Sequence, residues 1–185
     1  MPSFSQRLSS LEKPSRRPAE DLRYVQGKCA LGPLLVAFSE KGIVSVEMGK
    51  PMDVLMENLQ QRFPEAALVA GDREDRATMK EVIAYVNDPS QKLDAPVDLR
   101  GTEFQIKVWQ AVREVPAGET ATYRDIAEQI GAPRAMRAVG SACANNNHAM
   151  VVPCHRILRS DGTYAGGIDW CGVGQEALIR REKEK

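Results

Sequence analysis

The stretch VVPCHRIL, residues 151–158, is the part of the chain around which the rest is organised. Its apolar start predicts a short buried strand that ends at Pro153. Cys154, His155 and Arg156 follow in consecutive positions, and a thiolate is a strong nucleophile whose pKa is lowered by cationic neighbours. Adjacent residues of a strand point to opposite faces, so His155 would reach the Cys154 sulfur only across a turn or through a water. The stretch is a candidate reactive site, and the alternative is a half-buried free cysteine beside a surface histidine.

The composition is that of an ordinary globular protein: 185 residues, of which 43% are hydrophobic and 27% charged, with a formal net charge of zero. No apolar run in the sequence approaches the ~18 residues of a membrane-spanning helix, and the N-terminus has no apolar signal-peptide block. The four cysteines lie far apart and form no C-x-x-C pair, which argues against a zinc site or a disulfide framework. We therefore expect a cytoplasmic protein without membrane association, metal or cofactor.

Composition divides the chain into three segments. Residues 1–22 are rich in Ser, Pro, Arg and Glu and predict a disordered lead or linker. Residues 23–92 predict a small α/β domain, and residues 93–185 a mainly helical domain. The fold class expected for the whole chain is therefore α/β (α+β), with the polar stretch 90–100 as the connection between the two domains.

The first domain is expected to hold one hairpin and two helices. Alternating and apolar residues over 34–48 predict a β-hairpin whose turn ends at Gly42. Apolar residues at helical spacing predict a helix over 52–63. They also predict a second helix that carries Met79, Val82, Ile83 and Val86 and ends before Asp88.

The second domain carries the pattern of a helix-turn-helix. Thr102 begins the sequence of a capping box and thus a first helix. A second helix is capped by Thr122 and ended by Gly131, and after a turn through Pro133 a third helix is predicted over 134–144. Two short helices joined by a tight turn that contains glycine predict a winged-helix-like helix-turn-helix, with an ordinary αα-hairpin as the alternative.

The surface of the 134–144 helix favours the DNA-binding interpretation. Arg134 and Arg137 are expected to project from it, while small residues such as Ala138 and Ser141 permit close approach to a groove. Residues 124–159 contain five arginines and two acidic residues, so this region can attract a polyanion although the whole chain is neutral.

A series of motifs in chain order resembles one known family. The series is Tyr123, RAVGSAC at 137–143, Asn146, PCHR at 153–156 and LIRRE at 178–182. It resembles the O6-alkylguanine-DNA alkyltransferases, most closely the C-terminal alkyltransferase half of the bacterial adaptive-response proteins. The resemblance is specific over 101–182 and weaker, through GPLLVA at 32–37, in the preceding domain.

The resemblance implies a monomeric repair protein that binds double-stranded DNA carrying O6-alkylguanine. It implies transfer of the alkyl group to Cys154, once and without turnover, with O4-methylthymine as a further candidate substrate. His155 would deprotonate the thiol through a water, and Glu182 would orient the imidazole. Asn146 would hold the turn around the site, and Tyr123 would contact the guanine and assist its protonation.

The resemblance also implies how DNA and base are held. Arg137 would fill the gap left when the nucleotide is flipped out, and the Ile157 carbonyl would meet the exocyclic amine of guanine. The other residues carried over are Arg134, Ala138 and Ser141 on the DNA side and Ala165 on the substrate side.

The chain departs from the family pattern around the substrate-covering loop. Gln175 stands where the family has lysine, Ala165 stands where some members have serine, and the loop 164–171 is one residue longer. These differences leave open the tolerance for bulky alkyl groups. Two other functions are to be weighed: a non-catalytic binder of alkylated DNA, whose known examples lack the cysteine, and a Cys-His hydrolase, for which the sequence offers no oxyanion hole.

Overall fold

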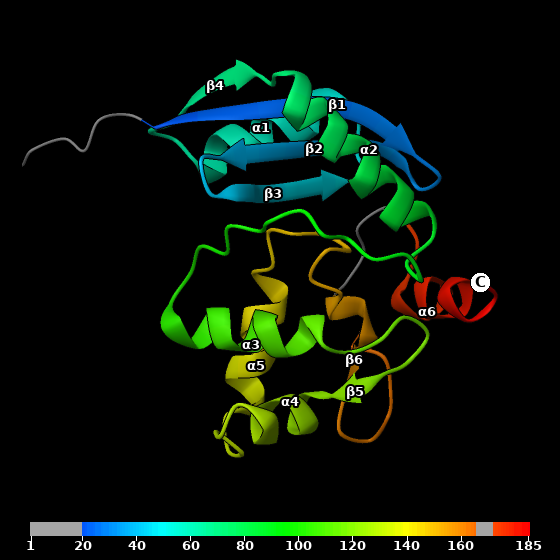
Figure 1. Cartoon of the computed structure of the whole chain (residues 1–185). Coiled ribbons are helices and arrows are strands. Elements are labelled where there is room, and N and C mark those ends of the chain that lie inside the picture. Colours follow the sequence, from blue (N-terminus) through cyan, green and yellow to red (C-terminus); the bar gives the residue numbers. More distant parts are fainter. Residues whose placement is uncertain (1–19, 166–171) are drawn as a thin grey trace, which may run out of the picture.

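The computed structural model describes residues 20–165 and 172–185 and arranges them in two stacked units (Figure 1). One unit is a four-stranded sheet with a helix on each face, and the other is mainly helical. Within these described ranges, no helix is both long and apolar enough to cross a membrane. The mixed α/β fold class expected from the sequence is confirmed.

The first unit runs from residue 21 to residue 87. Its elements are β1 (Asp21–Cys29), β2 (Gly32–Ser39), β3 (Gly42–Met48), α1 (Met52–Arg62), β4 (Ala67–Ala70) and α2 (Arg73–Asn87). The strands lie in the order β3-β2-β1-β4, with β4 parallel to β1 and the other pairs antiparallel. The predicted hairpin is therefore the β2–β3 pair, and its turn ends at Gly42, whose φ of 132° favours glycine.

Strand β2 shows why this sheet has two covered faces. Leu35 and Ala37 pack with the α1 side chain Leu55, whereas Leu34 and Val36 belong to the cluster that contains α2. Successive residues of a strand point to opposite faces, so a strand that is buried on both faces is continuously apolar rather than alternating.

One prediction for this unit is corrected, and the structure adds the start of a predicted helix. The disordered lead expected over 1–22 is wrong for residues 21 and 22, because β1 begins at Asp21 and the Leu22 side chain is fully buried. Helix α2 carries the predicted apolar residues and ends before Asp88, and it begins at Arg73 because Asp72 and Asp75 form a capping box. The sequence analysis also missed β1 and β4, which have no clean period of two.

The second unit contains four helices and a small parallel strand pair among the described residues. Its elements are α3 (Glu103–Arg113), β5 (Ala121–Thr122), α4 (Tyr123–Gln129), α5 (Met136–Ala144), a 3₁₀ turn (Cys154–Arg156), β6 (Ile157–Leu158) and α6 (Gln175–Lys183). The capping boxes expected at Thr102 and Thr122 are both present. Trp109 is buried, and its indole N–H donates to the Ala142 carbonyl of α5 at 2.9 Å, which fixes α3 against α5.

Two local predictions for this unit are wrong. Val151 and Val152 form a turn and not a strand, and their apolar side chains are buried in two different clusters. Helix α5 begins at Met136, so Pro133 and Arg134 lie in the turn that precedes it.

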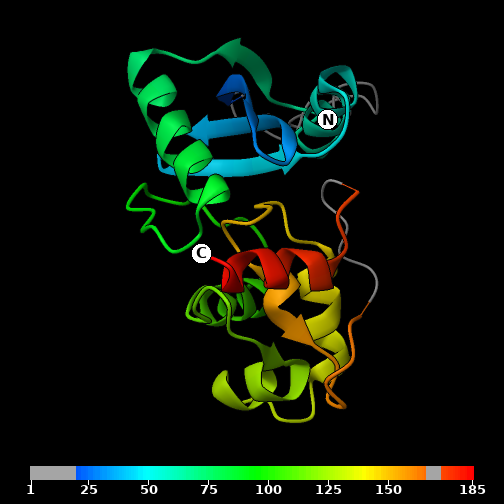
Figure 2. The ribbon, with the colours of Figure 1, turned by 90° about the vertical axis from the view of Figure 1, so that its right-hand side faces the viewer.

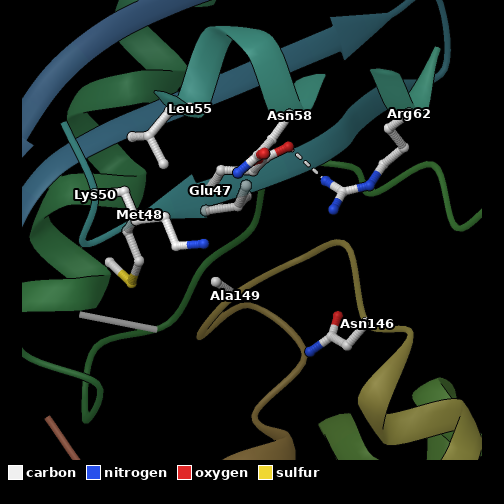
Figure 3. Close-up of a pocket in the computed structure, with 9 residues that line it drawn as sticks. Glu47, Met48, Lys50, Leu55, Asn58, Arg62, Asn146 and Ala149 are labelled. Carbon is white, nitrogen blue, oxygen red and sulfur yellow. Dashed lines mark hydrogen bonds and ion pairs between the residues drawn. The ribbon is translucent and has the colours of Figure 1, made fainter. Parts of the chain in front are cut away.

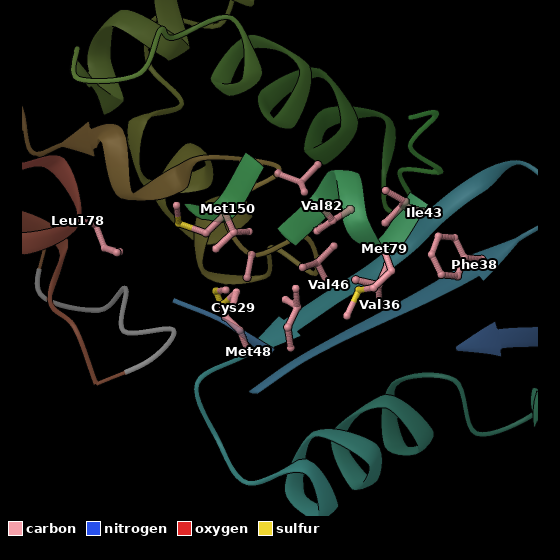
Figure 4. Close-up of a cluster of buried hydrophobic side chains, with 14 residues drawn as sticks. Cys29, Val36, Phe38, Ile43, Val46, Met48, Met79, Val82, Met150 and Leu178 are labelled. Carbon is pink, nitrogen blue, oxygen red and sulfur yellow. The ribbon is translucent and has the colours of Figure 1, made fainter. Parts of the chain in front are cut away.

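The two units share backbone pairing and a core. The edge of β3 is extended by the segment 147–149, because Val46 N–H donates to the Asn147 carbonyl at 2.8 Å and Ala149 N–H to the Val46 carbonyl at 3.1 Å. Met150 and Leu178 from the second unit belong to the apolar cluster of the sheet and α2 (Figure 4). Figure 2 shows α6 lying across the second unit, next to the segment that carries the 3₁₀ turn. The segment before the reactive stretch is thus held by the sheet.

Candidate active site at Cys154

The reactive stretch adopts a single 3₁₀ turn over Cys154–Arg156, and all three side chains are buried. Residues of a 3₁₀ helix are about 120° apart, so the three side chains point in three directions. The strand geometry assumed from the sequence does not apply. Cys154 is fully buried, His155 is fully buried, and Arg156 is directed into the protein toward α6.

Glu182 on α6 is the hub of the buried polar groups. Its carboxylate lies 2.6 Å from His155 Nε2 and accepts two hydrogen bonds of 3.0 Å from Arg156. A fourth hydrogen bond, also of 3.0 Å, comes from the Gly118 backbone N–H. Burial raises the pKa of Glu182, but the hydrogen bonds from His155 and Arg156 outweigh this effect and bring the pKa down to about 2. The carboxylate is therefore ionised at neutral pH.

This carboxylate sets the tautomer of His155. An ionised carboxylate only accepts hydrogen bonds, so His155 Nε2 carries the proton that points at Glu182. Burial lowers the pKa of His155 although Glu182 acts in the opposite direction, so the imidazole is neutral at pH 7. A neutral imidazole protonated at Nε2 presents Nδ1 as its basic atom.

Arg156 does not serve the thiol as the sequence analysis supposed. Its guanidinium is bound to Glu182 and donates to the Val115 carbonyl at 2.6 Å. Burial, and then the neighbouring Cys143 thiol, raise the pKa of Cys154 well above its usual value. In the resting protein Cys154 is therefore a protonated thiol, and its neighbours do not lower its pKa in the way that the sequence suggested.

Asn146 ties the turn before the reactive stretch together. Its side-chain amide donates to the Val152 carbonyl at 2.8 Å and lies 3.5 Å from the Cys154 sulfur. Its carbonyl oxygen accepts from the His148 backbone N–H at 2.8 Å. One side chain thus spans the segment from residue 146 to residue 154.

Asn146 also lines a cavity of about 140 Å³ at the junction of the two units (Figure 3). The other walls come from β3 and α1 and include Glu47, which is paired with Arg62. Cys154 does not line this cavity. The cavity therefore belongs to the junction between the units and not to the reactive thiol.

Tyr123 is brought close to the thiols by the start of α4. It is the first residue of that helix and is half-buried. Burial, followed by Cys143 and Cys154, raises the pKa of Tyr123 to about 12. The phenol therefore remains protonated at neutral pH and can act as a hydrogen-bond donor.

Helix α5 separates a buried face from an exposed one. Val139, Ala142 and Cys143 are buried in the core of the second unit. The exposed residues include those predicted for DNA contact, Arg137, Ala138 and Ser141, and Arg134 is exposed in the turn before the helix.

Gln175 joins Ile157 and Ala165, the two residues that the resemblance places on the substrate side. In the sequence Gln175 stood out only as a departure from the family pattern. The Gln175 side-chain amide donates to the Ile157 carbonyl at 2.6 Å and accepts from the Ala165 backbone N–H at 3.1 Å. Residues 166–171 of the loop singled out in the sequence lie outside the described residues. Gly118 and Val115 were also missed, since backbone groups that bind a distant side chain leave no sequence signal.

A buried thiol is followed in the chain by a histidine that is paired with a carboxylate, on a helix-turn-helix scaffold. This arrangement defines a class of protein with a candidate cysteine nucleophile. Comparison with known proteins identifies the family within this class. The family model for the 6-O-methylguanine DNA methyltransferase DNA-binding domain matches residues 103–184. The chain is 45% identical over 180 residues to the bifunctional transcriptional activator/DNA repair enzyme Ada of Escherichia coli, covering 96% of this chain and 50% of that protein.

Other relatives are covered more fully. The inducible methylated-DNA–protein-cysteine methyltransferase of Bacillus subtilis is 38% identical over 138 residues, covering 72% of this chain and 77% of that protein. The Mycobacterium tuberculosis OGT structure in complex with DNA aligns with a TM-score of 0.70 and 31% identity, covering 88% of this chain and 93% of that one. The chain belongs to the methylated-DNA–protein-cysteine methyltransferase family. It spans about half the length of the Ada proteins that it matches.

Proposed function

We propose that this protein repairs duplex DNA by taking the alkyl group of O6-methylguanine onto Cys154, irreversibly and once per molecule. The observation that carries this proposal is the buried turn in which the Cys154 thiol is followed directly by His155, whose imidazole is fixed by Glu182 at 2.6 Å. Nucleophile, base and orienting carboxylate are the three parts of an activated-nucleophile site.

The reaction is a displacement at the methyl carbon. The S–C bond to Cys154 forms while the C–O bond to guanine breaks, and the thiol proton passes to His155 Nδ1 through a water. Guanine leaves as the anion of its lactam unless it gains a proton, which the Tyr123 phenol can assist. The net change is that Cys154 exchanges a proton for a methyl group and the base takes up a proton.

Access to a base inside a duplex requires that the nucleotide be flipped out of the stack. The exposed face of α5 is suited to this because Ala138 and Ser141 allow close approach and Arg137 can take the place of the extruded base. Cys154 is fully buried, so the flipped base reaches it only when the side chains over the thiol give way.

We also propose that the protein acts as a monomer in the cytoplasm and needs no cofactor. The reaction requires no electron transfer and no metal-bound water. A thioether is stable to water under mild conditions, and the mechanism includes no step that would release the methyl group from Cys154.

The test is mass spectrometry after incubation with excess duplex that contains O6-methylguanine. The expected product is one added methylene mass per protein molecule, on the peptide that contains Cys154. Cys154→Ser is expected to abolish transfer and keep DNA binding, whereas Cys29→Ser is expected to leave transfer intact. Repair beyond one equivalent with unmodified Cys154, or methyl transfer by Cys154→Ser, would show the proposal to be wrong.

A further inference from the structure

Gln175, the first residue of α6, has a buried polar side chain that plays no part in the proposed chemistry. It is 3% exposed, and its amide bridges the Ile157 carbonyl at 2.6 Å and the Ala165 N–H at 3.1 Å. A primary amide carries both a donor and an acceptor, so it satisfies both backbone groups at once. Lysine, which occupies this position in the family pattern, could donate to the carbonyl but could not accept from the N–H.

The Ile157 carbonyl lies next to the nucleophile. Ile157 follows the turn that carries Cys154, and its N–H donates to the Cys154 carbonyl. The Ile157 side chain is fully buried in the same apolar cluster as Cys154. A base whose alkyl group reaches the Cys154 sulfur must therefore come to lie beside this segment, where the Ile157 carbonyl is an acceptor.

The alkylated bases differ in what they can offer to such an acceptor. O6-alkylguanine has lost its N1–H, so its exocyclic amine is the only donor on its pairing edge. O4-alkylthymine has no donor on that edge at all. A buried carbonyl without a hydrogen-bond donor is destabilising. A site in which only the base could donate to the Ile157 carbonyl would therefore select for bases that carry the amine.

We propose that Gln175 sets the base specificity of this site. Its amide donates a hydrogen bond to the Ile157 carbonyl whenever the bound base has no exocyclic amine to donate. A carbonyl oxygen has two lone pairs, so guanine can donate to it beside the Gln175 amide or in its place. The expected result is a site that accepts alkylated bases with and without the exocyclic amine. This inference rests on the proposed alkyl transfer to Cys154.

The test compares two substrates that differ only in that amine. Single-turnover rates are measured on duplexes that contain O6-methylguanine or O6-methylhypoxanthine, with the full chain and with Gln175→Met, which has a similar length and no donor. The ratio used below is the rate with O6-methylguanine divided by the rate with O6-methylhypoxanthine. In the wild-type protein this ratio is expected to be near one. In Gln175→Met the reaction with O6-methylhypoxanthine is expected to slow by about tenfold more than that with O6-methylguanine.

The ratio separates specificity from damage to the site. A variant that merely loosens the site slows both substrates equally, and an unchanged ratio in Gln175→Met would overturn the proposal. Gln175→Lys keeps a donor for the carbonyl and loses the Ala165 contact, so its ratio is expected to stay near the wild-type value. A Gln175→Lys ratio as high as that of Gln175→Met would also overturn it. Failure of the proposed function itself looks different, because the wild-type protein would then transfer no methyl group from O6-methylguanine.

Discussion

The buried group formed by His155, Arg156 and Glu182, called the relay below, belongs to the same unit as the exposed face of α5. The two are built in opposite ways. In the relay the charged side chains are withdrawn from water, and Glu182 accepts hydrogen bonds from His155, Arg156 and the Gly118 backbone N–H. On α5 the side chains expected to meet DNA are exposed and small or flexible, such as Arg137. The difference fits the proposed division of roles, in which the chemistry uses groups that are fixed in advance and DNA is met by exposed groups.

The largest effect is expected from removing the hub of the relay. Glu182→Ala leaves the buried Arg156 charge without its carboxylate, which is expected to lower the free energy of unfolding by about 3–5 kcal/mol and to abolish transfer. Glu182→Gln keeps the shape and is expected to fold better but still react slowly. Denaturant unfolding and single-turnover rates measure both effects. Glu184→Ala, at an exposed position near the end of α6, is the matched control and is expected to behave as wild type.

A second experiment tests whether burial keeps the imidazoles neutral. Burial lowers the pKa of His148 from 6.5 to about 4, and burial also lowers that of His155. Between pH 6.5 and about 4 the unfolded chain therefore binds protons that the folded chain does not, so stability falls as pH falls. Each histidine contributes a slope of up to about 1.4 kcal/mol per pH unit.

The His148→Asn variant isolates one of these contributions. Its unfolding free energy is expected to fall less steeply with decreasing pH than that of the wild type, by about one proton's slope. Chemical denaturation at a series of pH values from 7.5 to 4.5 gives the two slopes. Equal slopes would show that His148 titrates normally in the folded protein.

On the exposed face the expected effect falls on duplex repair and not on stability. Arg137→Ala is expected to slow methyl removal from duplex DNA by about tenfold, because the extruded base is no longer replaced in the stack. Its unfolding free energy is expected to change by less than about 0.5 kcal/mol, as is usual for an exposed position. Arg73→Ala, which removes the same charge at the start of α2, serves as the control. An equally large loss on free O6-benzylguanine, if it is a substrate, would place Arg137 in the chemical step.

The smallest expected effect concerns the N-cap of α4, which positions Tyr123. Thr122 caps α4, with its hydroxyl accepting from the Asp125 N–H at 3.1 Å, and Tyr123 is the next residue. Thr122→Ala is expected to cost about 1 kcal/mol of stability and to slow transfer only slightly. Thr102→Ala removes the corresponding cap of α3 and is expected to cost a similar amount of stability without affecting transfer. A stronger effect of Thr102→Ala on the rate would show that α3 contributes to positioning the site.

Local sequence signals located much of this structure. The capping residues Thr102 and Thr122 mark helix starts because the cap contacts lie within four residues, and Gly42 marks a turn because its backbone requires positive φ. The motif series from Tyr123 to Glu182 was enough to indicate the family, which the comparisons confirm. The roles carried over to single residues remain proposals.

What the sequence by itself determined is therefore the family, the helix-turn-helix and a set of candidate site residues. Only the tertiary structure decided how these groups are connected. Arg156 binds Glu182 instead of the thiol, because α6 packs against the 3₁₀ turn. Val151 and Val152 are buried in a turn, because two clusters of the folded chain take up their side chains. Gln175 bridges Ile157 and Ala165 across 18 and 10 residues of chain, and such contacts follow from packing, which local periodicity does not encode.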